Sequence, residues 1–264
     1  MLLAQISDLH VVPKGELAYG KVDTAAMLRD AIEHLKRLPL KVDAVLVTGD
    51  LAHNGAPEAY EHLREVLAQL NCPVLVIPGN HDDIGHFRRA FADHAYLPHD
   101  GQFIQFVVDD YAVRIVAIDS VVPGRVRGML CAERLAWLDH TLAERPHTPT
   151  LVMMHHAPFA TGLQHVDLCG MDGIDGLEFV ISRHPQVERL VCGHVHRAIQ
   201  TRFGGSVAST CPSTAHQVQV DLRPDGQDAF TLEPAGFQLH RWNGRVLFTY
   251  TLNVGIFDGP FPFR

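Results

Sequence analysis

Aspartate, asparagine and histidine residues recur in five short polar clusters along this chain. All five clusters contain residue types that bind metal ions: Asp8-Leu9-His10, Gly49-Asp50, Gly79-Asn80-His81-Asp82, His155-His156 and Gly193-His194-Val195-His196. His194 and His196 are two positions apart, so in an extended segment their side chains point the same way. The adjacent His155 and His156 cannot both do so, and we expect at most one of them to be a ligand.

A single cluster of this kind can also be an ordinary hydrogen-bonded turn. The D-x-H pattern after a strand occurs by chance, and an H-x-H turn can be stabilised by hydrogen bonds alone. Five such turns, all built from metal-ligand residue types, are harder to explain without a metal. The candidate ligands are four imidazoles, two carboxylates and one amide oxygen: His10, His155, His194, His196, Asp8, Asp50 and Asn80.

Seven ligands exceed the four of a tetrahedral zinc site and suit two divalent ions, about 3.5–4 Å apart, that share a carboxylate. Mixed nitrogen and oxygen ligands without a thiolate favour iron, zinc, manganese or cobalt. Because only two carboxylates are present, the site keeps a positive charge that attracts phosphate. Such ions can lower the pKa of a bound water to about 7. We therefore expect a metal-bound hydroxide to hydrolyse a phosphate ester.

The clusters follow segments that are predicted to be buried strands. Residues 2–7, 44–50 and 73–80 are short apolar runs ending in polar residues, and two amphipathic helices separate them. Asp23 is the predicted N-cap of the first helix, and Pro57 the predicted start of the second. This alternation predicts a parallel sheet covered by helices, with the ligands at its carboxyl edge.

The second half of the chain is richer in strands. A predicted antiparallel hairpin over 105–119 precedes helices near 132–144 and 174–184 and strands at 150–154 and 189–193. From about 198 to 252 the chain reads as short strands between turns. We expect one α/β domain over 1–252, with two packed sheets, outer helices and a β-rich C-terminal part. The tail, 253–264, either covers an apolar surface or joins a subunit contact.

Composition limits the classes of function. The 264 residues are 47% hydrophobic and 20% charged, which is typical of a globular domain. A net charge of −8 argues against a nucleic-acid polymer as partner. Five cysteines without a C-x-x-C pair, no signal peptide and no long apolar span predict a cytoplasmic protein without a membrane partner. Of the 18 histidines, we expect those in polar or helical surroundings, such as His62 and His184, to be solvated.

The order of D-x-H, GD, GNHD, HH and GHxH resembles that of the calcineurin-like metallophosphoesterases. More closely, LLAQISDLH, VIPGNHDD, MMHHAP, CGHVH and AHQV resemble stretches of class III cyclic-nucleotide phosphodiesterases and of a bacterial binuclear glycerophosphodiesterase. The likeness covers nearly the whole chain. It implies a four-layer α/β/β/α sandwich and a homo-oligomer, for which residues 253–264 are a candidate contact.

The resemblance also implies a role for each candidate residue. One metal would be held by Asp8, His10 and His196 and the other by Asn80, His155 and His194, with Asp50 as the bridge. His155 rather than His156 is then the ligand. Asn80 and His81 would face the substrate, His81 at the scissile phosphate or the leaving oxygen. His216, in AHQV, would be a second substrate-facing histidine, and a structural role is its alternative.

One departure bears on the substrate. The segment GDLAHNG at 49–55 lacks the arginine with which protein phosphatases of this superfamily clamp a dianionic monoester, which favours a singly charged diester. Segments 11–22 and 157–173 carry few cations, so a small diester fits better than a long polyanion. We expect cyclic nucleotides, glycerophosphodiesters or both as substrates, with aryl phosphodiesters also accepted. The alternatives are a phosphomonoesterase, a nuclease and a non-catalytic scaffold.

Overall fold

A computed structural model describes residues 1–264, and two β-sheets form its centre. The first sheet contains, in spatial order, β15 (Leu247–Asn253), β14 (Gly236–Trp242), β1 (Leu2–Ile6), β2 (Ala44–Thr48) and β3 (Val74–Ile77). The second contains β10 (Gln200–Phe203), β11 (Ser206–Thr210), β9 (Val187–Cys192), β7 (Thr150–Met153), β5 (Arg114–Ala117) and β4 (Phe106–Val108). Two short ladders pair β6 (Gly128–Met129) with β8 (Met171–Asp172), and β12 (Gln217–Val218) with β13 (Phe230–Thr231).

Each main sheet combines a set of parallel strands with antiparallel strands, which lie on one side of the first sheet and at both edges of the second. The strands β1, β2 and β3 are parallel, as are β5, β7, β9 and β11. Antiparallel β14 and β15 extend the first sheet, while β4 and β10 close the two edges of the second. The predicted hairpin over 105–119 is confirmed as β4 and β5.

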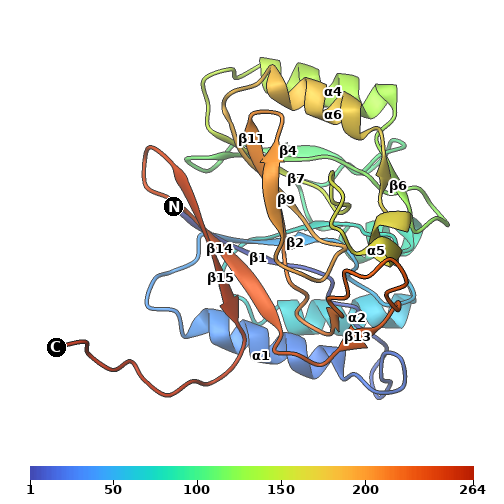
Figure 1. Ribbon diagram of the computed structural model, residues 1–264, viewed down its shortest axis with the longest axis vertical. Coiled ribbons are helices and arrows are strands. Elements are labelled where there is room, and N and C mark those ends of the chain that lie inside the picture. The colour runs from blue at the N-terminus through green and yellow to red at the C-terminus, as the bar shows by residue number, and fades with distance from the viewer.

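Helices lie on the outer faces of the sheets, so the layers run α/β/β/α as predicted (Figure 1). The helices α1 (Thr24–Lys36) and α2 (Pro57–Leu67) cover the first sheet, and α4 (Ala132–Ala143) and α6 (Ile174–Ser182) cover the second. The Asp23 side chain caps α1 by accepting from the Ala26 amide at 2.9 Å. Pro57 is the first residue of α2, where a missing N–H costs no hydrogen bond.

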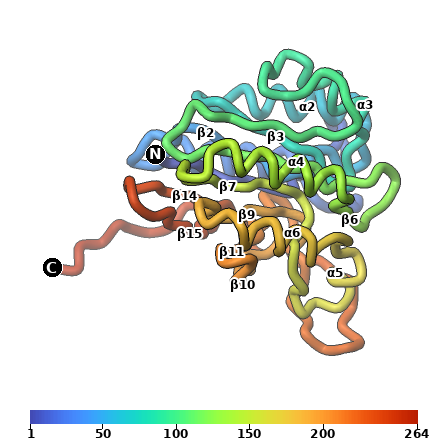
Figure 2. The backbone as a smooth tube through the Cα atoms, turned by 90° about the horizontal axis from the view of Figure 1, so that it is seen from above, coloured from blue at the N-terminus to red at the C-terminus, as the bar shows by residue number.

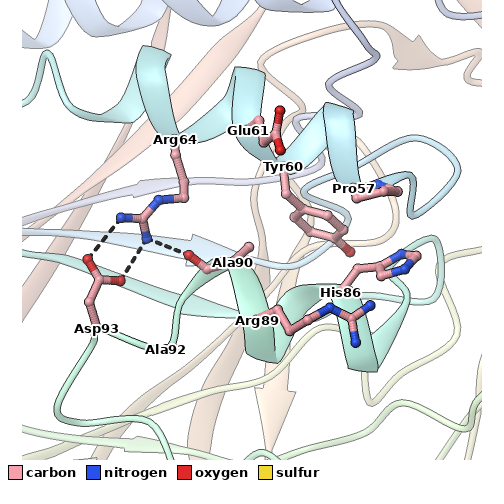
Figure 3. Close-up of a pocket in the computed structure, with 9 residues that line it drawn as sticks. All are labelled: Pro57, Tyr60, Glu61, Arg64, His86, Arg89, Ala90, Ala92 and Asp93. Carbon is pink, nitrogen blue, oxygen red and sulfur yellow. Dashed lines mark hydrogen bonds and ion pairs between the residues drawn. The ribbon is translucent and has the colours of Figure 1, made fainter.

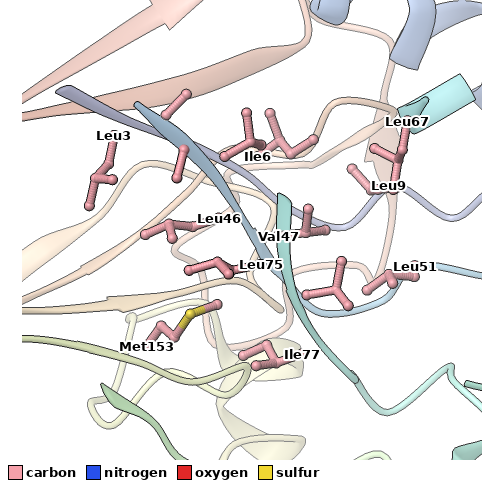
Figure 4. Packing of buried hydrophobic residues seen from close by; sticks show 14 of the residues in the cluster. Leu3, Ile6, Leu9, Leu46, Val47, Leu51, Leu67, Leu75, Ile77 and Met153 are labelled. Atoms are coloured by element: carbon pink, nitrogen blue, oxygen red, sulfur yellow. The ribbon is translucent and has the colours of Figure 1, made fainter. Parts of the chain in front are cut away.

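Side chains that alternate along the strands separate two apolar layers. Leu46 and Leu75 of the first sheet lie beside Met153 of the second, in the layer between the sheets (Figure 4). The neighbours of Met153 point the other way: Val152 and Met154 belong to the cluster under α4 and α6. Burial on both faces explains why these strands are continuous apolar runs.

Two expectations were wrong or incomplete. His62 and His184 are buried, not solvated: His62 Nδ1 donates to the Val12 carbonyl oxygen at 3.0 Å, and His184 Nε2 contacts Asp139 Oδ1 at 2.8 Å. Sequence periodicity also missed α3 (Ile84–Ala90), which packs beside α2, and α5 (Gln164–Leu168). Both helices are too short for an apolar stripe to recur along them.

The chain ends in an extended segment beyond β15. Residues 254–264 lead away from the layered body, as the two views in Figures 1 and 2 agree. Among the helices, none combines the length and the apolar composition that a bilayer crossing requires.

Candidate metal centre

The seven candidate ligands follow the carboxyl ends of five parallel strands, three in the first sheet and two in the second. They are Asp8 and His10 after β1, Asp50 after β2, Asn80 after β3, His155 after β7, and His194 and His196 after β9. Polar contacts join the two sheets at this edge. The Gln5 amide donates to the Cys192 carbonyl oxygen at 3.0 Å, and His155 Nδ1 donates to the Thr48 carbonyl oxygen at 2.8 Å. The ligands of both sheets therefore converge on one place.

Backbone strain is concentrated at this edge. Five of the seven candidates have a left-handed backbone: Asp8 (φ 52°), His10 (46°), Asp50 (50°), His194 (67°) and His196 (53°). Tyr19 is the one other non-glycine residue with positive φ. Such conformations cost on the order of 1–3 kcal/mol each and persist where the surrounding structure imposes them, typically at functional sites.

Glycines precede the ligands because no side chain fits there. A Cβ on Gly79 would lie 2.2 Å from both the backbone nitrogen and Oδ1 of Asp50. A Cβ on Gly193 would lie 2.1 Å from Ser7 Oγ and 2.9 Å from Asp8 Oδ2. Real Cβ atoms are not found this close to other heavy atoms, so these glycines let two loops approach the carboxylates directly.

The first group of ligands is almost completely buried. Asp8, His10, Asp50 and His196 each place a ligand atom within 4.8 Å of the others. His10 Nε2 lies 3.1 Å from His196 Nε2 and 3.7 Å from Asp50 Oδ2, and His196 Nε2 lies 3.5 Å from Asp8 Oδ1. The Asp8 carboxylate also accepts the His194 amide proton, at 2.9 and 3.1 Å to its two oxygens.

The second group shares Asp50 with the first. His155 Nε2 lies 3.0 Å from Asn80 Oδ1 and 3.4 Å from Asp50 Oδ1. The His194 ring lies beside the His155 ring, with a centroid separation of 5.1 Å. Asp50 therefore presents one oxygen to each group, since its Oδ2 faces His10.

Proton positions on the imidazoles test whether a cation fits. A carbonyl oxygen only accepts, so the nitrogen facing it carries the proton. His155 Nδ1 faces the Thr48 carbonyl and His196 Nδ1 faces the His216 carbonyl at 2.9 Å, which leaves both Nε2 atoms as acceptors when the rings are neutral. His155 Nε2 then points at amide and carboxylate oxygens that are acceptors as well. A cation between them removes this repulsion, so the donor set fits metal ions.

Protonation of the ligands is also shifted in a direction that suits a metal. Burial lowers the pKa of His194 to about 3 and that of His10 well below its usual value, which keeps these rings neutral. Burial alone would lower the pKa of His155, but Asp50 and Asp8 outweigh it and raise that pKa to about 9. Positive charge is therefore favoured at the point where His155 faces Asp50.

His156 has no free nitrogen for a metal. Its Nδ1 lies 2.8 Å from Ser120 Oγ and its Nε2 donates to the Val126 carbonyl oxygen at 3.0 Å. The ring is fully buried and lies against Gly128, where a Cβ would come within 2.5 Å of it. His156 therefore holds the segment before β6 in place, while the adjacent His155 faces the metal-ligand cluster.

His81 lies at the rim of the cluster and is partly open to solvent. Its Nδ1 donates to the His53 carbonyl oxygen at 2.7 Å, and its Nε2 lies 4.0 Å from Asp50 Oδ2. The His81 amide donates to Asp50 Oδ1 at 2.9 Å. The backbone thus holds the ring so that its Nε2 faces Asp50 at the rim of the cluster.

His216 is brought to the same cluster by the loop before β12. Its ring centroid lies 5.2 Å from that of His10 and 4.6 Å from that of His196, and its Nδ1 is buried without a hydrogen-bond partner. Burial lowers the pKa of His216 to about 3, so the ring is neutral. An unpartnered buried polar atom is rare in folded proteins, which makes this ring a candidate for contact with a bound molecule.

Sequence reasoning missed two residues that shape the site. His53 follows Asp50 in GDLAHNG, and its Nδ1 lies 3.3 Å from His10 Nδ1. Asp82, in GNHD, accepts from Tyr60 and from the amides of three residues of the ligand loops, Leu51, Ala52 and Gly79, at 2.8–3.0 Å. Both belong to quoted motifs, but neither the position of the His53 ring nor the buried acceptors of Asp82 can be read from residue spacing.

One large cavity lies elsewhere. A hollow of about 580 Å³ between α2 and α3 is lined by residues such as Tyr60, Arg64 and Arg89 (Figure 3). Arg64 is paired there with Asp93 and the Ala90 carbonyl oxygen. None of the candidate ligands lines this hollow, so the site is identified by converging donors and not by volume.

Comparison with known proteins agrees with this arrangement. The family described as calcineurin-like phosphoesterase matches residues 1–198. A probable glycerophosphodiester phosphodiesterase, GpdQ, of Arcobacter nitrofigilis is 37% identical, over 100% of this chain and 97% of the relative. The 3',5'-cyclic adenosine monophosphate phosphodiesterase CpdA of Escherichia coli K12 is 30% identical, over 81% of this chain and 76% of the relative.

Solved structures share the fold at lower identity. A dimetal phosphatase from Danio rerio superposes with a TM-score of 0.66 at 16% identity, and the match covers 97% of this chain and 99% of that one. At this identity the likeness concerns the four-layer architecture alone.

Proposed function

Because the chain belongs to the calcineurin-like phosphoesterase family, we propose that it is a phosphodiesterase that hydrolyses small diesters with two divalent metal ions. One observation carries the proposal. Buried imidazole nitrogens converge with carboxylate and amide oxygens from two sheets, and metal ions between them would be shared partners for both kinds of donor.

The two groups of ligands suggest how the ions are shared. Asp8, His10 and His196 would hold one ion; Asn80, His155 and His194 would hold the other; Asp50 would contribute an oxygen to each. Mixed nitrogen and oxygen donors favour iron, zinc, manganese or cobalt. When bound, such ions neutralise charge on phosphoryl oxygens and make a water acidic enough to act as a nucleophile near neutral pH.

Two histidines are proposed to act on the substrate. His81 is fixed through Nδ1, so its Nε2 can contact a phosphoryl oxygen or the leaving oxygen beside Asp50. The His216 ring lies beside those of His10 and His196, and its Nδ1 has no hydrogen-bond partner. Both rings orient a phosphate without being needed to hold an ion.

The residues after Asp50 support a diester rather than a monoester. The segment Leu51-Ala52-His53-Asn54 contains no arginine, and the residue of this segment that lies beside the candidate ligand His10 is the imidazole of His53. A diester carries a single negative charge at neutral pH and needs less compensation. The names of relatives in both branches make cyclic nucleotides and glycerophosphodiesters the first substrates to test.

The test is turnover of cyclic AMP, glycerophosphoethanolamine, bis(p-nitrophenyl) phosphate and p-nitrophenyl phosphate by one metal-loaded sample whose metal content is measured. We expect about two ions per chain and faster hydrolysis of the bis-aryl diester than of the monoester. Asp50→Asn should lose both metal and turnover, whereas Asp30→Asn, exposed on α1, should keep both. A faster monoester reaction would identify a phosphomonoesterase, and two bound ions without turnover of any ester would identify a scaffold.

A further inference from the structure

Tyr19 is held beside the candidate metal centre by a strained turn. Its φ of 52° is rare for a bulky residue. Two hydrogen bonds of 2.9 Å between Ala18 and Val22 close the turn, and both residues are buried against Val12. The Tyr19 side chain remains 49% exposed. The strained backbone of this turn thus places an aromatic ring at the surface of the site.

Phe230 meets Tyr19 from the far end of the chain. It belongs to β13, which pairs with β12, and its partly buried ring packs on the same apolar base as the Tyr19 turn. The ring centroids of Tyr19 and Phe230 lie 5.0 Å apart at an interplanar angle of 32°. This distance is typical of interacting aromatic pairs. In Figure 1 the loop after β1 and β13 meet at the same corner of the molecule.

The aromatic pair is one ring away from the proposed ligands. His216 lies between them: its centroid is 5.1 Å from Tyr19, 5.0 Å from Phe230, and 5.2 Å from His10. On the other side, the Tyr19 ring lies 4.7 Å from His53. A phosphate at the metal centre would therefore place an attached group over His216 and against the aromatic pair.

We propose that Tyr19 and Phe230 form a stacking site for a planar substituent of the phosphodiester, an aryl group or a nucleobase. The inference rests on the proposed phosphodiesterase function and specifies the substrate class. Stacking of a base on an aromatic ring is worth about 1–3 kcal/mol, whereas a glycerol or ethanolamine group offers no π-face. The pair therefore favours aromatic diesters over aliphatic ones.

A binding experiment isolates the stacking contribution. AMP and ribose 5-phosphate carry the same phosphate and sugar, and only AMP has a base. By calorimetry on the metal-loaded protein, we expect AMP to bind about tenfold more tightly than ribose 5-phosphate. Phe230→Ala should remove most of this difference, and Tyr19→Phe should retain it because the ring remains. Equal affinities of the wild type for the two ligands would overturn the proposal.

Kinetics give the second readout. The ratio of kcat/KM for bis(p-nitrophenyl) phosphate to that for glycerophosphoethanolamine should fall about tenfold in Phe230→Ala, mainly through KM. Phe248→Ala, on the outer strand β15, should keep the wild-type ratio. Equal losses on both diesters would show that Phe230 only supports the fold and would overturn the proposal. Absence of turnover in the wild type, with the AMP preference intact, would instead contradict the phosphodiesterase function alone.

Discussion

Five of the seven candidate ligands have a backbone conformation that is unfavourable for residues with a side chain. Asp8, His10, Asp50, His194 and His196 all have positive φ. In the left-handed region the chain turns sharply, and these turns follow β1, β2 and β9 at one edge of the sheets. Hydrogen bonds hold these turns, for example from the His194 amide to Asp8 and from the His81 amide to Asp50. The site is therefore preorganised by main-chain contacts to its own carboxylates.

His81 provides a test of how roles are divided within this cluster. We expect His81→Ala to retain both metals and to lose turnover by about 10²–10⁴-fold, because its proposed role is to contact the substrate and not to hold an ion. Metal analysis and diester turnover on the same sample check this. His99→Ala, at an exposed position before the β4 segment, serves as the control. Loss of metal in His81→Ala would place the ring among the ligands and contradict the assignment.

At the level of elements, a series of buried hydrogen bonds connects β14 to the strands that carry the candidate ligands. His240 of β14 accepts from Thr249 at Nδ1 (2.8 Å) and donates from Nε2 to Gln5 Oε1 (3.1 Å). The Gln5 amide donates to Thr48 Oγ1 at 2.9 Å. The Thr48 carbonyl oxygen, in turn, accepts from the candidate ligand His155. Every contact of His240 is satisfied by a neutral ring.

This arrangement makes a prediction about pH. Burial lowers the pKa of His240 to about 3, below the value of about 6.5 in an unfolded chain. Below pH 6.5 His240 becomes protonated in the unfolded chain but stays neutral in the folded protein. The free energy of unfolding therefore falls as the pH decreases from 6.5 to about 3. One proton corresponds to at most about 1.4 kcal/mol per pH unit.

Urea unfolding between pH 7.5 and 4.5 measures this slope. We expect His240→Gln to be less stable at pH 7.5 but to lose stability less steeply on acidification, by up to about 1.4 kcal/mol per pH unit. His147→Gln, at an exposed position, should keep the wild-type slope. Parallel curves for His240→Gln and the wild type would show that His240 is not the group excluded from protonation.

At the scale of the whole molecule, the C-terminal tail is the part that the fold leaves unexplained. Ile256, Phe257, Phe261 and Phe263 are 62–108% exposed, and they follow the outer strand β15, on which Phe248 and Tyr250 are also exposed. Of the two roles expected for residues 253–264, only Val254 covers the body of the same subunit, by packing against the apolar core. Residues 255–264 are exposed and lead away from the layers (Figure 2). We propose the other, a contact with a second copy of the chain.

Light scattering coupled to size-exclusion chromatography tests this proposal. The full chain should elute as a homo-oligomer, and removal of residues 254–264 should lower the mass to that of a smaller species. A variant with Phe257, Phe261 and Phe263 changed to serine should behave like the truncated chain while retaining the metal centre. A monomeric full chain, or an oligomer that survives both changes, would rule out the tail as the subunit contact.

Much of the architecture and the inventory of ligands could be predicted from the sequence, because strand periodicity is local and parallel strands bring their carboxyl ends to one edge. The same argument could not separate His155 from His156, since it does not say which ring nitrogens the surrounding carbonyls occupy. It also misjudged His62 and His184, whose burial depends on partners such as Val12 and Asp139.

Residue types and their spacing along the chain thus determined the family resemblance, the layer order and the set of metal-ligand candidates. Tertiary structure alone decided the direction of each ring, the strain at the strand ends and the meeting of Tyr19 with Phe230. The physical reason is that a hydrogen-bond direction or a ring contact belongs to a pair of groups, and the partners here come from opposite ends of the chain. No local pattern encodes such a pair until the sheets pack together.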